Sequence, residues 1–442
     1  MEEKLVISGG IRLSGEIDVA GAKNSVLKQM AAALLYPGHI RLRNVPNLAD
    51  VYSMIEVLEF IGAKVKFKDS ILDIDSSDIS GLFAPQELVN KLRASFNVMG
   101  ALLGRFKEAR VALPGGCQIG ARKLDLHEKG LIALGANVKV EQGYMIATAT
   151  KLTGARIYLD IPSNGATENI MVCGVLAEGE TIIENAACDP EITDLANFLN
   201  AMGAKIEGAG THKIVIKGVK LKDLHSTDYS VIKDRLEAST YLIAAVATGG
   251  EIIMRDIEPE LLQATTSKLI EAGVDITFEN NILRAKTNLQ RLKPLKLSTG
   301  WFPAFPTDTQ PMMAIPLCIA EGTSTVRETI YEDRFSYTNE LGKMGADISV
   351  NNNIAVINGV EKLTGAKIKA QDIRAGAGLV IAGLMAEGKT EVTGLSFIDR
   401  GYENIESKFR SIGANINRTK AMTSETAESH IASENMDNSK AK

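Results

Sequence analysis

Apolar and polar positions repeat along this chain at a regular interval. An apolar helix end, then Gly-Ala or a close variant, then a short alternating strand recurs about every 70 residues. The six copies of this marker are Ile61-Gly62-Ala63, Leu134-Gly135-Ala136, Met202-Gly203-Ala204, Ala272-Gly273-Val274, Met344-Gly345-Ala346 and Ile412-Gly413-Ala414. We therefore expect six similar units, each with helices and short strands.

A second marker recurs at a similar interval, a helix of small and apolar residues that ends in glycine and precedes a strand. It occupies residues 35–42, 102–111, 176–183, 245–253, 319–326 and 384–392. Helices of period 3.6 alternating with short strands are typical of the α/β or α+β class. Because one core stops growing at about 250–300 residues and the chain has 442, we expect two domains of three units each rather than an open solenoid.

These units predict the domain boundaries. Domain one is expected over about residues 22–230 and domain two over about 231–418. The segment from Lys4 to Val19 alternates like a strand, and its residues alone allow pairing with either domain. Residues 419–442 are polar, with too little apolar surface to offset the entropy of ordering, so we expect a disordered tail.

The residues that open each unit's long helix form a third repeated feature. They are Lys23-Asn24-Ser25, Arg93-Ala94-Ser95, Gly165-Ala166-Thr167, Asp234-Arg235, Thr307-Asp308 and Asp372-Ile373-Arg374. A helix N-terminus carries partial positive charge, so Lys23, Arg93 and Arg374 are unfavourably placed unless a ligand compensates them. Each could instead be a solvated side chain, but recurrence in three units favours an anionic ligand where the helix starts converge.

A glycine-rich loop from Leu113 to Arg122 holds Cys117 at its middle. Free thiols commonly lie in cores as small apolar groups. A cysteine on a polar glycine loop, five residues before Arg122, indicates a reactive thiol. The alternative is a loop cysteine with no chemical task.

Composition excludes several classes of function. The net charge of −5 and pI near 5.8 give no general field for nucleic acid. The opening residues Met-Glu-Glu-Lys-Leu show neither the basic start nor the apolar run that is typical of a signal peptide. No stretch of the sequence is as long and apolar as the roughly 18 to 20 residues of a membrane span, so we expect a cytoplasmic protein without membrane contact. The four cysteines lie far apart and the five histidines are scattered, so we expect no disulfide framework, metal site or cofactor.

Several motifs together resemble the enolpyruvyl transferases. They are Gly21-Ala22-Lys23-Asn24, Arg93-Ala94-Ser95, the Leu-Pro-Gly-Gly-Cys loop through Arg122, Phe305-Pro306-Thr307-Asp308, Glu332-Asp333-Arg334-Phe335, Asp372-Ile373-Arg374-Ala375 and Asp399-Arg400-Gly401-Tyr402-Glu403. The resemblance covers about residues 5–417. It implies two similar domains of three α/β units each with buried helices, an inside-out α/β barrel type, and a cleft that closes on substrate. It also implies that residues 1–21 belong with domain two.

The resemblance also implies a reaction. The enolpyruvyl group of phosphoenolpyruvate is transferred to the 3-hydroxyl of UDP-N-acetylglucosamine and phosphate is released, an early step of peptidoglycan synthesis. Addition and then elimination pass through a tetrahedral ketal, so one proton must reach the methylene carbon and another must leave the sugar hydroxyl. Both substrates are anionic, as the unfavourably placed cations suggest.

Residue roles follow position by position from the resemblance. Cys117, Asp308, Lys23 and Arg400 form the catalytic set, with Asp308 as base for the 3-hydroxyl and Cys117 as proton donor or in product release. Cys117 also matches the residue that fosfomycin alkylates. The residues implied for phosphoenolpyruvate are Lys23, Arg93, Arg122, Arg334, Arg374 and Arg400, and those for UDP-N-acetylglucosamine are Asn24, Arg93, Asp125, Asp308 and Ile330.

Two alternatives stay open at the level of sequence. One is the sister transferase that uses shikimate 3-phosphate, against which stand the cysteine loop and Lys23-Asn24 where that sister usually has Lys-Ser. The other is a non-catalytic relative that only binds the nucleotide sugar. A binding module needs neither acid nor base, so the presence of Cys117 and Asp308 favours an enzyme.

Overall fold

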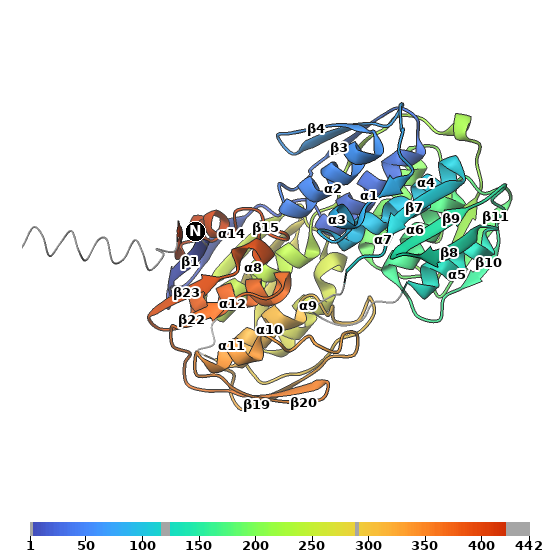
Figure 1. The fold of residues 1–442 in the computed structure, drawn as a ribbon. Coiled ribbons are helices and arrows are strands. Elements are labelled where there is room, and N and C mark those ends of the chain that lie inside the picture. The colour runs from blue at the N-terminus through green and yellow to red at the C-terminus, as the bar shows by residue number, and fades with distance from the viewer. Residues whose placement is uncertain (1–2, 116–123, 288–290, 421–442) are drawn as a thin grey trace, which may run out of the picture.

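The computed structural model describes residues 3–115, 124–287 and 291–420. Figure 1 shows two lobes, one built by the blue to green half of the chain and the other by the yellow to red half. Strand β1 (Glu3–Ser8), at the N-terminus, lies in the second lobe beside the red end of the chain.

Three four-stranded sheets belong to the first lobe, and each has the same topology. One edge pair is parallel and the other pairs are antiparallel. In sheet order the strands are β14 (Asp228–Ser230), β3 (His39–Arg43), β5 (Ile71–Asp75) and β4 (Lys64–Lys68); β6 (Phe83–Ala84), β7 (Glu108–Ala112), β9 (Tyr144–Thr148) and β8 (Asn137–Glu141); β10 (Arg156–Tyr158), β11 (Glu180–Glu184), β13 (Lys213–Lys217) and β12 (Ile206–Glu207).

The second lobe repeats this plan with three further sheets. In order these are β2 (Ser14–Ile17), β15 (Glu251–Arg255), β17 (Ile282–Lys286) and β16 (Asp275–Glu279); β18 (Lys296–Ser298), β19 (Thr323–Arg327), β21 (Ile354–Asn358) and β20 (Asp347–Asn351); β22 (Lys367–Lys369), β23 (Lys389–Thr393), β1 and β24 (Asn415–Lys420). In each of the six sheets of the described chain, the central strands alternate buried and partly exposed residues, so one face of every sheet packs inward.

Buried helices fill the space inside the sheets. In α8, all thirteen residues are buried, which suits a helix enclosed on every side. The buried helices are α1 (Lys23–Ala32) with η1 (Ala33–Leu35), η2 (Arg93–Asn97) with α4 (Val98–Phe106), α6 (Asn164–Gly174), α8 (Arg235–Ala247), α10 (Gln310–Leu317) and α12 (Ile373–Met385). This arrangement confirms the predicted α/β class of repeated units with buried helices.

The remaining helices connect these layers and expose one side. They are α2 (Ala49–Ile61), α3 (Gln86–Val89), α5 (Asp125–Ala133), α7 (Pro190–Ala201), η3 (Leu221–Asp223), α9 (Pro259–Glu271), α11 (Thr338–Gly342), α13 (Leu395–Ile398) and α14 (Ile405–Ser411). Among the residues that the structure describes, no helix combines the length and the apolar character needed to cross a bilayer.

The repeated glycine of the sequence marker has a conformational reason. Gly62 ends α2 with a φ of 113°, and its N–H donates to the carbonyl of Leu58. The other five marker glycines also have positive φ, a region that other residues rarely adopt. The helix, glycine and strand order predicted for each unit is therefore confirmed.

Two separate clusters of buried apolar residues support the proposed division into two domains. One runs from Ala22 to Val231, and the other combines residues 5–19 with residues 238–416. β1 pairs with both β23 and β24, so the N-terminal strand sits inside a sheet of the second lobe. One boundary needs correction: β24 continues to Lys420 because Thr419 and Lys420 pair with β1, so these two residues are not part of a tail. Residues 421–442 lie outside the described chain.

Candidate functional site

The candidate site lies where the chain crosses between the lobes. The two crossing segments pair with each other: Ala22 N–H donates to the Ile232 carbonyl over 2.7 Å, and Asp234 N–H donates to the Ala20 carbonyl over 2.8 Å. A Cβ on Gly21 would come within 1.8 Å of the Asn44 carbonyl oxygen, so only glycine fits there. The crossings therefore bring the starts of α1 and α8 together.

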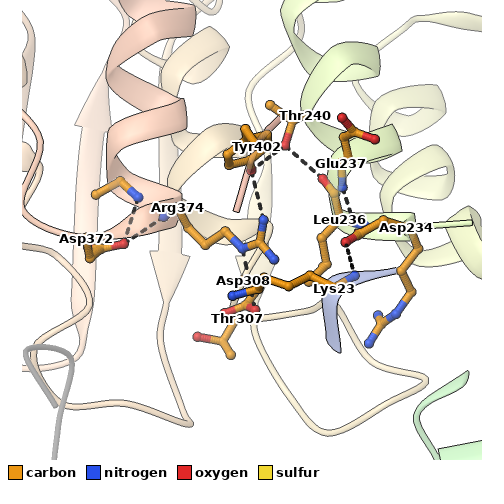
Figure 2. A network of polar contacts seen from close by, with 12 residues as sticks. Lys23, Asp234, Leu236, Glu237, Thr240, Thr307, Asp308, Asp372, Arg374 and Tyr402 are labelled. Atoms are coloured by element: carbon orange, nitrogen blue, oxygen red, sulfur yellow. Dashed lines mark hydrogen bonds and ion pairs between the residues drawn. The ribbon is translucent and has the colours of Figure 1, made fainter. Parts of the chain in front are cut away.

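Asp234 connects these two helix starts. Its Oδ1 accepts from the N–H groups of Leu236 and Glu237 at 2.8 and 3.0 Å, which caps α8. Its Oδ2 accepts from the backbone N–H of Lys23 at 3.1 Å, so the same carboxylate also binds the first N–H group of α1 (Figure 2). One buried carboxylate thus aligns helices from both lobes.

The Lys23 side chain reaches a second carboxylate, that of Asp50. Lys23 Nζ lies 3.0 Å from Asp50 Oδ2, and Arg400 Nε lies 2.7 Å from Asp50 Oδ1. Lys23 is only 7% exposed and Asp50 only 1%. Lys23 is therefore not the solvated side chain that the sequence left possible. We call Lys23, Asp50 and Arg400 the Asp50 cluster.

A second cluster surrounds Asp308, two residues before α10. Arg334 Nη2 donates to Asp308 Oδ1 at 2.7 Å, and Arg374 Nε lies 3.6 Å from Asp308 Oδ2. Asp308 itself is partly buried, whereas Arg334 and Arg374 are 2% and 4% exposed. Two buried guanidinium groups thus face one accessible carboxylate. We call Asp308, Arg334, Arg374 and Tyr402 the Asp308 cluster.

Arg374 is held in place by the start of its own helix and by Tyr402. Asp372 Oδ1 accepts from the N–H groups of Arg374 and Ala375, both at 2.9 Å, and caps α12. Arg374 Nη1 donates to Tyr402 Oη at 3.0 Å, and that hydroxyl lies 2.8 Å from Thr240 Oγ1 (Figure 2). Burial disfavours the charge of Arg374, but Tyr402 and Asp308 more than offset it, so its pKa lies above the ordinary value.

One tripeptide joins the two clusters. Arg400 contacts Asp50 and Tyr402 contacts Arg374, with Gly401 between them. A Cβ on Gly401 would lie 2.4 Å from Ile373 Cγ2, so glycine permits the close approach to α12. Cations from both lobes therefore meet on Asp50, and residues 400–402 connect this cluster to the arginines around Asp308. Such a concentration of cations suits an anionic substrate.

The other residues named from the sequence lie on separate segments of the chain. Asn24 is partly buried in α1, Arg93 opens η2, and Asp125 is exposed at the start of α5. The Ile330 N–H donates to Glu328 Oε1 at 2.8 Å. Arg93 lies close enough to α5 that its charge, after burial itself, lowers the pKa of His127.

Cys117 and Arg122 lie outside the described residues, so their predicted roles stay predictions. The three cysteines that the structure describes, Cys173, Cys188 and Cys318, are free and buried. Burial raises the pKa of Cys173 and of Cys318 to about 12. These thiols are poor nucleophiles at neutral pH. Across the ranges described, no three His, Cys, Asp or Glu side chains gather as potential metal ligands.

Sequence reasoning missed Asp50 as a site residue. It is one of many acidic residues in a first helical turn, and nothing in its neighbours distinguishes it. Asp234 and Tyr402 were within recognised motifs but had no assigned role. Their importance depends on contacts between segments more than 150 residues apart, as the separations of Lys23 from Asp234 and Thr240 from Tyr402 show.

Comparisons with known proteins agree on one family. The model of the EPSP synthase (3-phosphoshikimate 1-carboxyvinyltransferase) family matches residues 7–409. UDP-N-acetylglucosamine 1-carboxyvinyltransferase 2 of Carboxydothermus hydrogenoformans is 52% identical over 94% of this chain and 99% of its own, and the Clostridium botulinum enzyme named UDP-N-acetylglucosamine 1-carboxyvinyltransferase is 49% identical over the same shares.

Solved structures share the fold. The enolpyruvyl transferase NikO from Streptomyces tendae superimposes with a TM-score of 0.85 at 26% identity, and covers 95% of this chain and 100% of its own. EPSP synthase from Acinetobacter baumannii, at 19% identity over the same shares and a TM-score of 0.73, is similar in fold alone. With the family model and the curated relatives covering nearly the whole length, this chain belongs to the enolpyruvyl (1-carboxyvinyl) transferase family and is an enzyme of that family.

Proposed function

We propose that this enzyme transfers the enolpyruvyl group of phosphoenolpyruvate to the 3-hydroxyl of UDP-N-acetylglucosamine and releases phosphate, an early step of peptidoglycan synthesis. Relatives that carry this acceptor in their names, at 46–52% identity, support the choice of acceptor. One observation supports the proposed site most strongly: Lys23 and Arg400, from opposite lobes, both contact the carboxylate of Asp50.

Lys23, Arg122 and Arg400 hold the phosphate of phosphoenolpyruvate in this proposal, with Arg93 beside them. Fixed cations stabilise charge that develops on a leaving phosphate without reorganising during the reaction. Arg334 and Arg374 engage the carboxylate side of the substrate, which the burial of both guanidinium groups next to Asp308 supports. Closure of the two lobes then excludes water from the charged intermediate.

Asp308 takes the proton of the 3-hydroxyl, and Cys117 supplies a proton or assists product release. A base must lie within hydrogen-bond reach of the group it deprotonates. Asp308 suits this role because its carboxylate is partly accessible while two arginines orient it. Asn24, Arg93, Asp125 and Ile330 contact the nucleotide sugar together with Asp308. Fosfomycin is expected to alkylate Cys117.

We infer that the reaction takes place in the cytoplasm. No cofactor is required, because the addition and elimination need only proton transfer and charge stabilisation.

Phosphate release with each acceptor tests this proposal. UDP-N-acetylglucosamine should support release from phosphoenolpyruvate, and shikimate 3-phosphate should not. The second acceptor is included because the matching family model describes a 3-phosphoshikimate enzyme. Release with shikimate 3-phosphate alone would identify the sister reaction, and binding of the nucleotide sugar without turnover would identify a non-catalytic relative.

A further inference from the structure

Asp50 is buried between two cations and uses one oxygen for each. Oδ2 faces Lys23 Nζ at 3.0 Å and Oδ1 faces Arg400 Nε at 2.7 Å. The side chain lies in the first turn of α2, where the helix dipole favours a negative charge. Asp50 thus provides these cations with the same kind of charge-assisted contacts that a phosphoryl group would provide.

Backbone contacts hold Asp50 against the second lobe on both sides of Arg400. The Ala49 N–H donates to the Asp399 carbonyl at 3.2 Å, and the Asn47 N–H donates to Glu403 Oε2 at 3.0 Å. The start of α2 is therefore docked on residues 399–403 independently of the Asp50 side chain. Removing the charge of Asp50 leaves these two contacts in place.

We propose that Asp50 competes with the phosphoryl group for Lys23 and Arg400 and so weakens the binding of phosphate at the site. The inference rests on the proposed function, which assigns phosphate to these two cations. A bound phosphoryl group must share cations that Asp50 already neutralises, and its negative charge lies beside that carboxylate. Asp50 is a positioning residue in this account: it aligns the cations and keeps released phosphate from being held too tightly.

Titration of inorganic phosphate into the full-length protein tests the proposal. Asp50→Asn keeps the size of the side chain and removes its charge, so the phosphate Kd should fall about tenfold. Asp50→Glu should restore weak binding. Glu56→Gln is the matched control, since it also removes one charge from α2 and an ion pair, that with Lys91 at 2.6 Å, but on the surface. Its phosphate Kd should equal that of the unmodified protein.

Turnover provides a readout that a merely structural role would not produce. In Asp50→Asn, KM for phosphoenolpyruvate and kcat should both fall, because the anion binds more tightly and phosphate leaves more slowly. Unchanged or weaker phosphate binding in Asp50→Asn, or no phosphate binding in any form, would overturn the proposal. Melting curves check folding, and Asp50→Ser repeats the test should the asparagine variant unfold. Absence of enolpyruvyl transfer by the unmodified protein would refute the proposed function, whereas the phosphate titration decides the role of Asp50.

Discussion

Asp308 faces two guanidinium groups and is the proposed base. Asparagine has nearly the same shape as aspartate but no negative charge, so one substitution tests the role of Asp308 as base. Asp308→Asn keeps the shape and removes the base, and turnover should fall about a hundredfold or more while affinity for the nucleotide sugar changes little. Kinetics and calorimetric titration measure the two effects. Asp347→Asn is the control, because it replaces an exposed carboxylate by a carboxamide on β20 of the same lobe. Near-normal turnover in Asp308→Asn would remove this residue from the mechanism.

His127 is the residue whose titration should affect stability most clearly. It is buried, its ring packs edge-on against Phe96, and its Nδ1 lies 2.9 Å from Asn169 Nδ2. Burial, then the charges of Arg93 and Lys28, lowers its pKa from 6.5 to about 3. The unfolded chain therefore binds a proton that the folded protein excludes, and stability falls as pH drops below about 6.5.

The expected difference can be measured with one variant. Between pH 7 and pH 5 the protein should lose about 2 kcal/mol more of its free energy of unfolding than His127→Gln does. Asp189, whose pKa burial raises to about 6, changes stability in the opposite direction, but it is present in both proteins and cancels. Urea unfolding at the two pH values gives the result. Equal losses in both proteins would mean that His127 is not buried in its neutral form.

At the scale of elements, the positive φ of the marker glycine Gly345 predicts that alanine substitutions at Gly345 and at the nearby Gly342 have opposite effects on stability. Gly345 has a φ of 90°, and a Cβ added to it would meet no atom within 4 Å, so Gly345→Ala should destabilise through backbone strain alone, by about 1 kcal/mol. Gly342, the last residue of α11, also has open space but no positive φ. Gly342→Ala should stabilise by about 0.4–1 kcal/mol. Thermal unfolding compares them, and the same sign for both would contradict this explanation of the repeat.

The elements themselves were largely predictable, because each unit has its own periodicity. The residues expected to open long helices lie at or within three residues of the observed starts of α1, η2, α6, α8, α10 and α12. The partners of those residues were not predictable. Asp50 reaches Arg400 across 350 positions of sequence, and no local pattern encodes such a pairing.

At the scale of the whole molecule, each lobe depends on strands from distant parts of the chain. β14 completes the sheet of β3, β2 completes that of β15, and β1 lies between β23 and β24. The alternating pattern of residues 4–19 predicted a strand but not its neighbours, since a strand can pair with any compatible edge. The family resemblance implied a place for this segment in domain two, and β1 and β2 pair with strands of the second lobe. A resemblance carries information about topology that the residues alone lack.

The position of β1 allows the proposed domain division to be tested. Ile7 is fully buried and packs against Gly383 of α12, where a Cβ would lie 2.9 Å from Ile7 Cδ1. Ile7→Ala should lower the free energy of unfolding by about 2–5 kcal/mol. Val6 is only half-buried on the same strand, so Val6→Ala should lower it by about 1 kcal/mol or less. In Ile7→Ala, backbone amide hydrogen exchange should become faster in β23 and β24, which pair with β1, and stay unchanged in β7 and β9 of the first lobe. Equal loss of protection in both lobes would show that they do not form separate cores.

Cations from both lobes are proposed to bind phosphoenolpyruvate, whose enolpyruvyl group then passes to the nucleotide sugar. Mass spectrometry of the nucleotide product, after incubation with phosphoenolpyruvate and UDP-N-acetylglucosamine, tests this proposal most directly. The unmodified protein should produce UDP-N-acetylglucosamine with an enolpyruvyl group on the 3-oxygen, and Lys23→Ala should produce far less and require more phosphoenolpyruvate. An unmodified nucleotide sugar after incubation with the folded protein, or equal product from Lys23→Ala, would contradict the account.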